Sequence, residues 1–210
     1  MNHRMLVSMA LTVAMVVPLT AQRPADRERI ADLVPIEIRP GLNRIPNAEG
    51  DGRDAQVFSA WRDNGNAWGY RIFIVTMPER SASGLAETAW SVVGIGAEGS
   101  GIERDTIRDT PHTGEDAVVS VRFARAALDG KPATLLITAE RRGWITVPDP
   151  SPALIRIYVL RNASERGEFV GTTPDVFLPV ISFSTTQNYS DADAALQAEL
   201  NLPLPEEKKN

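Results

Sequence analysis

The chain has 210 residues, with 22 lysine and arginine residues, 27 aspartate and glutamate residues, and no cysteine. The lack of cysteine excludes disulfides, thiolate metal sites and a cysteine nucleophile. The net charge of −5 argues against a nucleic-acid-binding protein, because neutralising phosphates requires a basic face.

The N-terminal segment is typical of a secretory signal peptide. Arg4 precedes an apolar run from Met5 to Leu19, and the small residue Ala21 follows. The run is shorter than the roughly 20 apolar residues of a transmembrane helix. We therefore expect cleavage after Ala21, a periplasmic location and no integral membrane segment. The removed segment holds one arginine and no acid, so the mature chain would carry a net charge of −6 instead of −5.

Residues 22–33 are charged and thinly apolar, which predicts an N-terminal linker. Residues 34–189 then carry the patterns of strands separated by turn residues. The predicted strands are the segment VPIEIRPG beginning at Val34, then Gln56–Trp61, Trp68–Met77, Thr88–Ile95, Ala117–Ala124, Thr134–Ala139, Leu154–Leu160 and Val176–Phe183. Both faces of Trp68–Met77 are largely apolar, which predicts a central strand in a covered sheet.

A helical period appears only near the C-terminus. Ser190 can cap a helix, Asp191 and Asp193 suit its first turn, and Ala194–Leu200 has good helix propensity. We predict a helix and tail over residues 190–210. The fold class is all-β: an antiparallel β-sandwich of about seven to nine strands with a short C-terminal helix.

Few residues are suited to catalysis. Once the signal peptide is removed His112 is the single histidine, and its loop context favours a solvated side chain over a catalytic one. Glu49, Asp51 and Asp54 lie among glycines, as in calcium loops, but they do not complete an EF-hand pattern. Carboxylate-based hydrolysis stays an alternative, with no acid in a recognisable frame. We predict no enzyme activity, no metal and no cofactor.

The segment RDNGNAWGY carries the strongest candidate site. Asn64, Gly65 and Asn66 tolerate positive φ, which hairpin turns demand. Aromatic rings beside polar side chains suit small ligands or sugars, although core packing is the commoner role for tryptophan. The candidate ligand-binding residues are Arg62, Asp63, Asn64, Asn66, Trp68 and Tyr70. For the polar ones, building the corner is the favoured role.

RDNGNAWGYRIFIV resembles a segment of the carbapenem self-resistance proteins, and ATLLITAERR and PALIRIYVLRN are similar to two core strands of that family. The likeness spans residues 38–162. It implies a periplasmic β-sandwich that protects against the antibiotic without hydrolysing it. Trp68 stands where the family usually has histidine, so a role needing that histidine is not carried over. In agreement, the Ser-x-x-Lys spacing of serine β-lactamases does not occur.

We therefore expect a secreted, non-enzymatic binding or protective protein with a small-molecule or envelope partner. The alternative is a carbohydrate-binding or envelope-adhesion module, in which Trp61, Trp68 and Tyr70 would form an exposed stacking platform. A homodimer formed through an apolar sheet face is a further alternative that the sequence leaves open.

Overall fold

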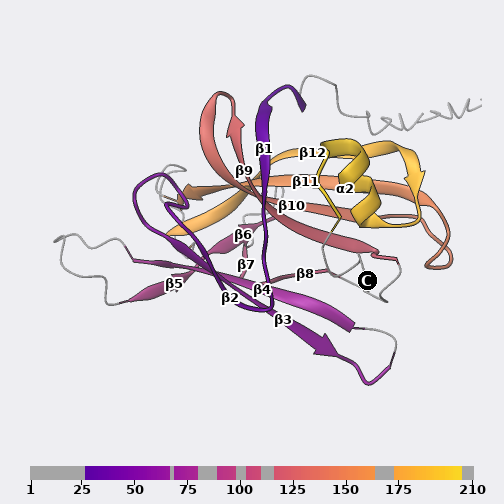
Figure 1. Cartoon of the computed structure of the whole chain (residues 1–210), viewed down its shortest axis with the longest axis horizontal. Helices are drawn as coiled ribbons and strands as arrows, with labels where there is room; N and C mark the ends of the chain where they lie inside the picture. The colour runs from indigo at the N-terminus through magenta and orange to yellow at the C-terminus, as the bar shows by residue number, and fades with distance from the viewer. Residues whose placement is uncertain are drawn as a thin grey trace, which may run out of the picture.

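The computed structural model describes residues 27–66, 69–79, 89–97, 103–109, 116–163 and 173–204. The described residues form a β-sandwich, and helix α2 (Ala192–Leu200) packs on the outer side of the larger sheet (Figure 1). The strands are β1 (Ile30–Ile36), β2 (Gly41–Ile45), β3 (Ala55–Asp63), β4 (Gly69–Pro78), β5 (Trp90–Val92), β6 (Gly94–Gly96), β7 (Glu103–Arg104), β8 (Ile107–Arg108), β9 (Val119–Leu128), β10 (Lys131–Arg141), β11 (Ser151–Asn162) and β12 (Asp175–Tyr189).

The strands form two sheets. The larger has the order β1-β9-β10-β11-β12-β6-β7, and the smaller has the order β2-β3-β4-β5, with β8 also paired to β4. Neighbours are antiparallel except for β12 and β6, which are parallel. The all-β sandwich class agrees with the prediction. The count of seven to nine strands was too low, because the described residues alone contain twelve and several are only two or three residues long.

Two boundaries differ from the predictions. β1 begins at Ile30, inside the segment predicted to be a linker, and pairs with β9. The predicted strand Thr88–Ile95 divides at Val93: β5 belongs to the smaller sheet and β6 to the larger one. Apolar periodicity marks both halves as extended, but it does not record a change of partner strand.

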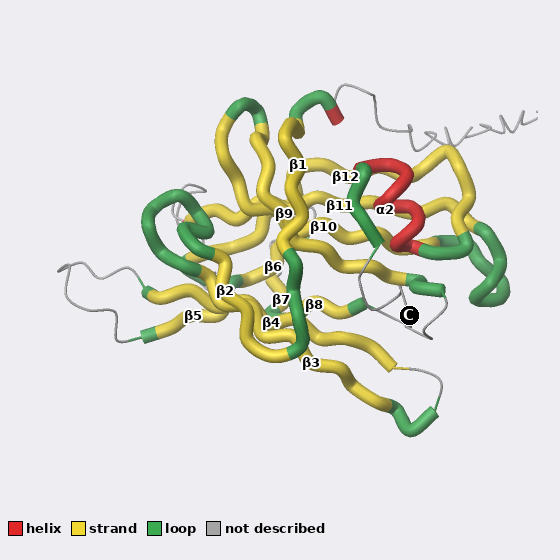
Figure 2. Tube along the Cα trace, in the orientation of Figure 1, coloured by secondary structure: helices red, strands yellow, loops and turns green. Residues whose placement is uncertain are grey.

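The larger sheet is buried on both faces. Toward the smaller sheet, Phe123, Leu136 and Tyr158 pack with Val57 and Phe73. The opposite face is covered by α2, as Figure 2 shows, through a cluster that contains Leu135, Ile137, Ile155, Ala195 and Leu196. Burial on two faces explains why β10 and β11 read as nearly continuous apolar runs.

The smaller sheet is buried on one face only. Phe73, Val75 and Met77 of β4 enter the core. On the other face Leu42 is 66% exposed and Phe58 is also exposed. The prediction of a covered central strand was therefore right about the position of β4 and wrong about its outer face.

Local signals set the turns and caps. Asp129 and Gly130 both have positive φ and join β9 to β10, as their Asp-Gly sequence predicts. Asp191 caps α2 by accepting a hydrogen bond from the Asp193 amide, so the cap lies one residue after the predicted Ser190. In the part of the chain that the structure describes, no helix is both long and apolar enough to cross a membrane.

A buried arginine joins the two sheets where β4 ends. The Arg53 guanidinium donates to both carboxylate oxygens of Asp175 at 2.7 and 2.8 Å, and to the Pro78 carbonyl at 2.8 Å. It also pairs with Glu49 at 2.9 Å and Asp51 at 2.7 Å. These bonds, led by the one to Asp175, raise the pKa of Arg53. Arg53 therefore connects the loop before β3 to β4 and to the start of β12.

We expect Arg53→Met to lower the free energy of unfolding by about 3 to 5 kcal/mol, because it leaves buried carboxylates without their cation. The matched control is Arg44→Met. Arg44 also pairs with an acid, Asp54, but the Arg44 side chain is largely exposed, and exposed ion pairs contribute little to stability. Urea unfolding of both variants measures the difference. Equal losses would contradict a special role for Arg53.

Candidate functional site

The hairpin between β3 and β4 was the predicted site, and its side chains mainly bind one another. Arg62 Nη1 donates to the Tyr70 hydroxyl at 2.6 Å. The guanidinium groups of Arg62 and Arg108 lie 5.5 and 5.2 Å from the centre of the Tyr70 ring. Cation–π contacts of this kind stabilise exposed pairs modestly. The Tyr70 ring is thus in contact with two arginine side chains of the same protein.

The corner itself is built by an aspartate turn. Asp63 Oδ1 accepts a hydrogen bond from the Gly65 amide at 2.7 Å, and Gly65 has φ +73°. Asn64 and Asn66 are exposed at the tip. Asp63 thus makes the side-chain hydrogen bond of this corner, and a structural role for Asn64 and Asn66 stays a prediction. Trp68 lies outside the described residues.

The predicted stacking platform does not form from the two described rings. Trp61 pairs across the hairpin with Arg71, and Arg62 pairs with Tyr70. Paired residues point to the same face and successive residues to opposite faces, so Trp61 and Tyr70 lie on opposite sides of the sheet. Trp61 is 50% exposed and its ring lies over Gly69.

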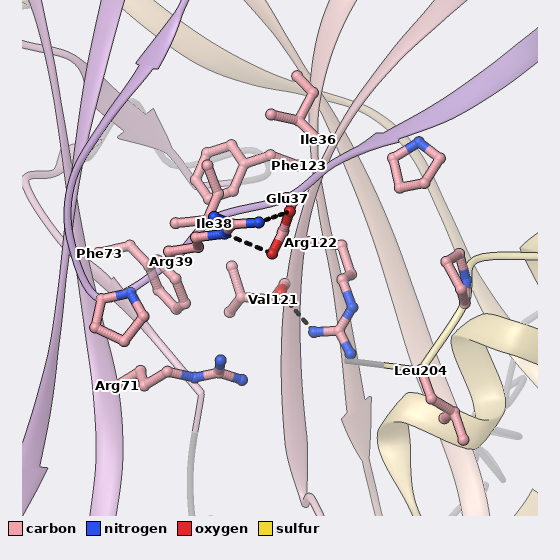
Figure 3. A pocket seen from close by; sticks show the side chains of 13 residues that line it. Ile36, Glu37, Ile38, Arg39, Arg71, Phe73, Val121, Arg122, Phe123 and Leu204 are labelled. Carbon is pink, nitrogen blue, oxygen red and sulfur yellow. Dashed lines mark hydrogen bonds and ion pairs between the residues drawn. The ribbon is translucent and has the colours of Figure 1, made fainter. Parts of the chain in front are cut away.

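A cavity lies where the chain passes between the sheets. β1 pairs with β9 as far as Ile36, opposite Phe123, and residues 37–40 then carry the chain to β2 in the other sheet. The open edge of β9, the start of β4, this crossing and the segment after α2 enclose about 360 Å³ (Figure 3). This volume is at the low end of the range of roughly 300 to 1,000 Å³ for small-molecule sites. Its lining residues are Pro35, Ile36, Glu37, Ile38, Arg39, Pro40, Arg71, Phe73, Val121, Arg122, Phe123, Pro203 and Leu204.

Two of the charged residues that line this cavity, Arg71 and Arg122, are each held by a buried carboxylate behind the guanidinium group. Asp109, just after β8, accepts from the Arg71 amide at 2.6 Å and from Arg71 Nε at 2.8 Å. The side chain of Arg71 is 12% exposed and that of Asp109 is 2% exposed. Asp109 thus orients the guanidinium while remaining out of the cavity.

Arg122 is held by the helix. Asp193, in the first turn of α2, accepts hydrogen bonds from Arg122 Nη2 and from the Ser120 hydroxyl. Arg122 Nη1 also donates to the Val121 carbonyl at 2.8 Å. Burial lowers the pKa of Arg122, the Asp193 carboxylate opposes this shift, and the positive charge of Arg71 adds to it. The two guanidinium groups are therefore within electrostatic reach, and Figure 3 shows them pointing toward one another.

The sequence carried only a faint signal for these residues. Arg71 falls on the core face of β4, the face assigned to Phe73, Val75 and Met77, where a charge is unexpected. Arg122 lies in the predicted strand Ala117–Ala124, and its side chain is only 14% exposed. A charge inside an apolar strand was the available clue, and its partners lie too far along the chain to be inferred.

Other candidates take a structural role or fall outside the description. Glu49 and Asp51, considered for calcium, bind the Arg53 guanidinium, and Asp54 binds Arg44 and the Asn47 amide. Among the described residues no group of three or more metal-binding side chains gathers in a suitable arrangement. His112 is not among the described residues.

The fold and this cavity define a β-sandwich protein with a cleft at one open end. One solved structure similar to it is the crystal structure of CarG, with a TM-score of 0.57 and 18% sequence identity, over 80% of this chain and 98% of that one. At that identity the likeness shows the fold alone. No protein-family model and no curated protein matches the chain.

The Trp61 ring occupies the space that a side chain at position 69 would need. A Cβ at this position would collide with the Trp61 ring, so we expect Gly69→Ala to displace the ring and cost about 1 kcal/mol, at the low end for overpacking because the ring is half-exposed. Tryptophan emission and urea unfolding measure both effects. In the Trp61→Ala background the same substitution should cost nothing; an unchanged cost there would contradict the proposed collision.

Proposed function

We propose that the chain is a secreted periplasmic binding protein that protects against a carbapenem without hydrolysing it. The observation that carries this proposal is the 360 Å³ cavity with an apolar floor and two oriented arginines. The fold shared with CarG and the motifs resembling carbapenem self-resistance proteins support the choice of ligand. Sequestration of the drug is the mode of protection that a cavity of this kind serves best.

We expect a carbapenem to raise the melting temperature of the mature protein, Gln22 to Asn210. A ligand at 100 times its dissociation constant stabilises by about 2.7 kcal/mol, which corresponds to roughly 5 to 10 °C for a domain of this size. The ultraviolet absorbance of the drug should stay constant over the same period, because binding without hydrolysis preserves the β-lactam ring.

A matched pair of variants locates the effect. Leu204→Trp fills the cavity wall, whereas Ile145→Trp adds the same ring at a fully exposed position that does not line the cavity. The first should abolish the shift and the second should preserve it. A shift with envelope sugars alone would favour the carbohydrate-binding alternative, and no shift with the carbapenem would refute sequestration.

A further inference from the structure

The chemistry of the cavity lining indicates which class of ligand the cavity binds. This inference rests on the proposed binding function. We infer that the cavity selects a compact organic monoanion, with its carboxylate beside the guanidinium groups of Arg71 and Arg122 and its apolar body against Phe73 and Phe123. Nothing in this inference requires the anion to be an antibiotic.

Arginine side chains supply most of the charged groups of the cavity lining. Of the lining residues that the structure describes, Arg39, Arg71 and Arg122 are cationic and Glu37 is acidic. Glu37 is engaged by Arg39 through two bonds of 2.8 and 3.0 Å. Arg71 and Arg122 are paired in the same way with Asp109 and Asp193. The cavity therefore offers guanidinium N–H donors and not an excess of positive charge, and the planar fork of these donors matches a carboxylate.

The buried carboxylates limit the ligand to a single negative charge. Asp109 and Asp193 are each 2% exposed and already neutralise much of the charge of the arginines they hold. A dianion would therefore meet too little positive charge to offset its desolvation. Burial and, after it, repulsion from Arg71 lower the pKa of Arg122, and a monoanion placed between the two arginines reduces that repulsion.

The rest of the lining requires an apolar ligand body. Phe73 and Phe123 pack with their ring centres 6.0 Å apart and form the floor. Ile36 and Ile38 come from the crossing, and Leu204 comes from the segment after α2. A ligand with an aliphatic or aromatic ring next to its carboxylate would cover these surfaces, while a small hydrophilic anion would leave them in water.

The test compares ligands that share one body and differ in charge: cyclohexanecarboxylate, cyclohexanecarboxamide and cyclohexylmethylammonium. Calorimetric titration of the mature protein should show the carboxylate binding at least about tenfold more tightly than the amide, since a charged hydrogen bond is lost. The ammonium compound should not bind, and added salt should weaken carboxylate binding. Equal binding of acid and amide, or no binding of the carboxylate, would overturn the inference.

A pair of isosteric substitutions tests the site without disturbing the buried ion pairs. Leu204→Glu and Leu204→Gln change the same wall residue and differ only in charge. The glutamate variant should bind the carboxylate several-fold more weakly than the glutamine variant, and both should bind the amide equally.

A second pair of variants tests the guanidinium group itself. Arg122→Lys keeps the charge beside Asp193 but loses the planar fork, so this variant should bind the carboxylate more weakly. Arg156→Lys, at an ion pair with Glu140 away from the cavity lining, is its control.

The outcomes separate this inference from the proposed function. Selective binding of the carboxylate without binding of the carbapenem would refute the proposed function and leave the ligand class standing. Binding of the carbapenem together with equal affinity for acid and amide would refute the ligand class and leave the proposed function standing.

Discussion

The sandwich depends on the buried guanidinium of Arg53, which fixes the sheets to each other at one end. It receives a carboxylate from β12 in the larger sheet and the carbonyl of Pro78 from β4 in the smaller one. Glu49 and Asp51, in the same loop, also bind the Arg53 guanidinium, so Arg53 holds the loop before β3 in place as well. An ion network of this kind is costly to desolvate but has a strict geometry, which suits it to setting the relative position of two layers.

The opposite end of β4 is not closed in this way, and there the cavity lies. β1 follows β9 as far as Ile36, and residues 37–40 then carry the chain to β2, with Pro40 as the last residue of the crossing. Proline restricts φ and donates no hydrogen bond, so Pro40 cannot donate to a strand ladder at the point where the chain enters the smaller sheet. The cavity lies between the open edge of β9 and this crossing, so it results from the way the chain passes from one sheet to the other.

The helix has two roles at this end of the fold. Its buried face, with Ala195 and Leu196, covers the outer side of the larger sheet. Its first turn supplies Asp193 to Arg122, where a carboxylate is also favoured by the helix dipole. The residues that follow it, Pro203 and Leu204, form a wall of the cavity. Docking of α2 therefore couples core burial to the orientation of a cavity arginine.

The sequence by itself determined the all-β class, the approximate positions of most strands, the Asp-Gly turn after β9 and a C-terminal helix, because these depend on apolar periodicity and local backbone preferences. The tertiary structure decided which strands share a sheet, where β5 and β6 part, and that Asp109 and Asp193 stand behind Arg71 and Arg122. Asp109 lies 38 residues after Arg71 in the sequence, and Asp193 lies 71 residues after Arg122. A strand pattern shows which face a side chain points to. The groups that contact the side chain on that face depend on how distant segments pack, and the candidate site consists of such long-range contacts.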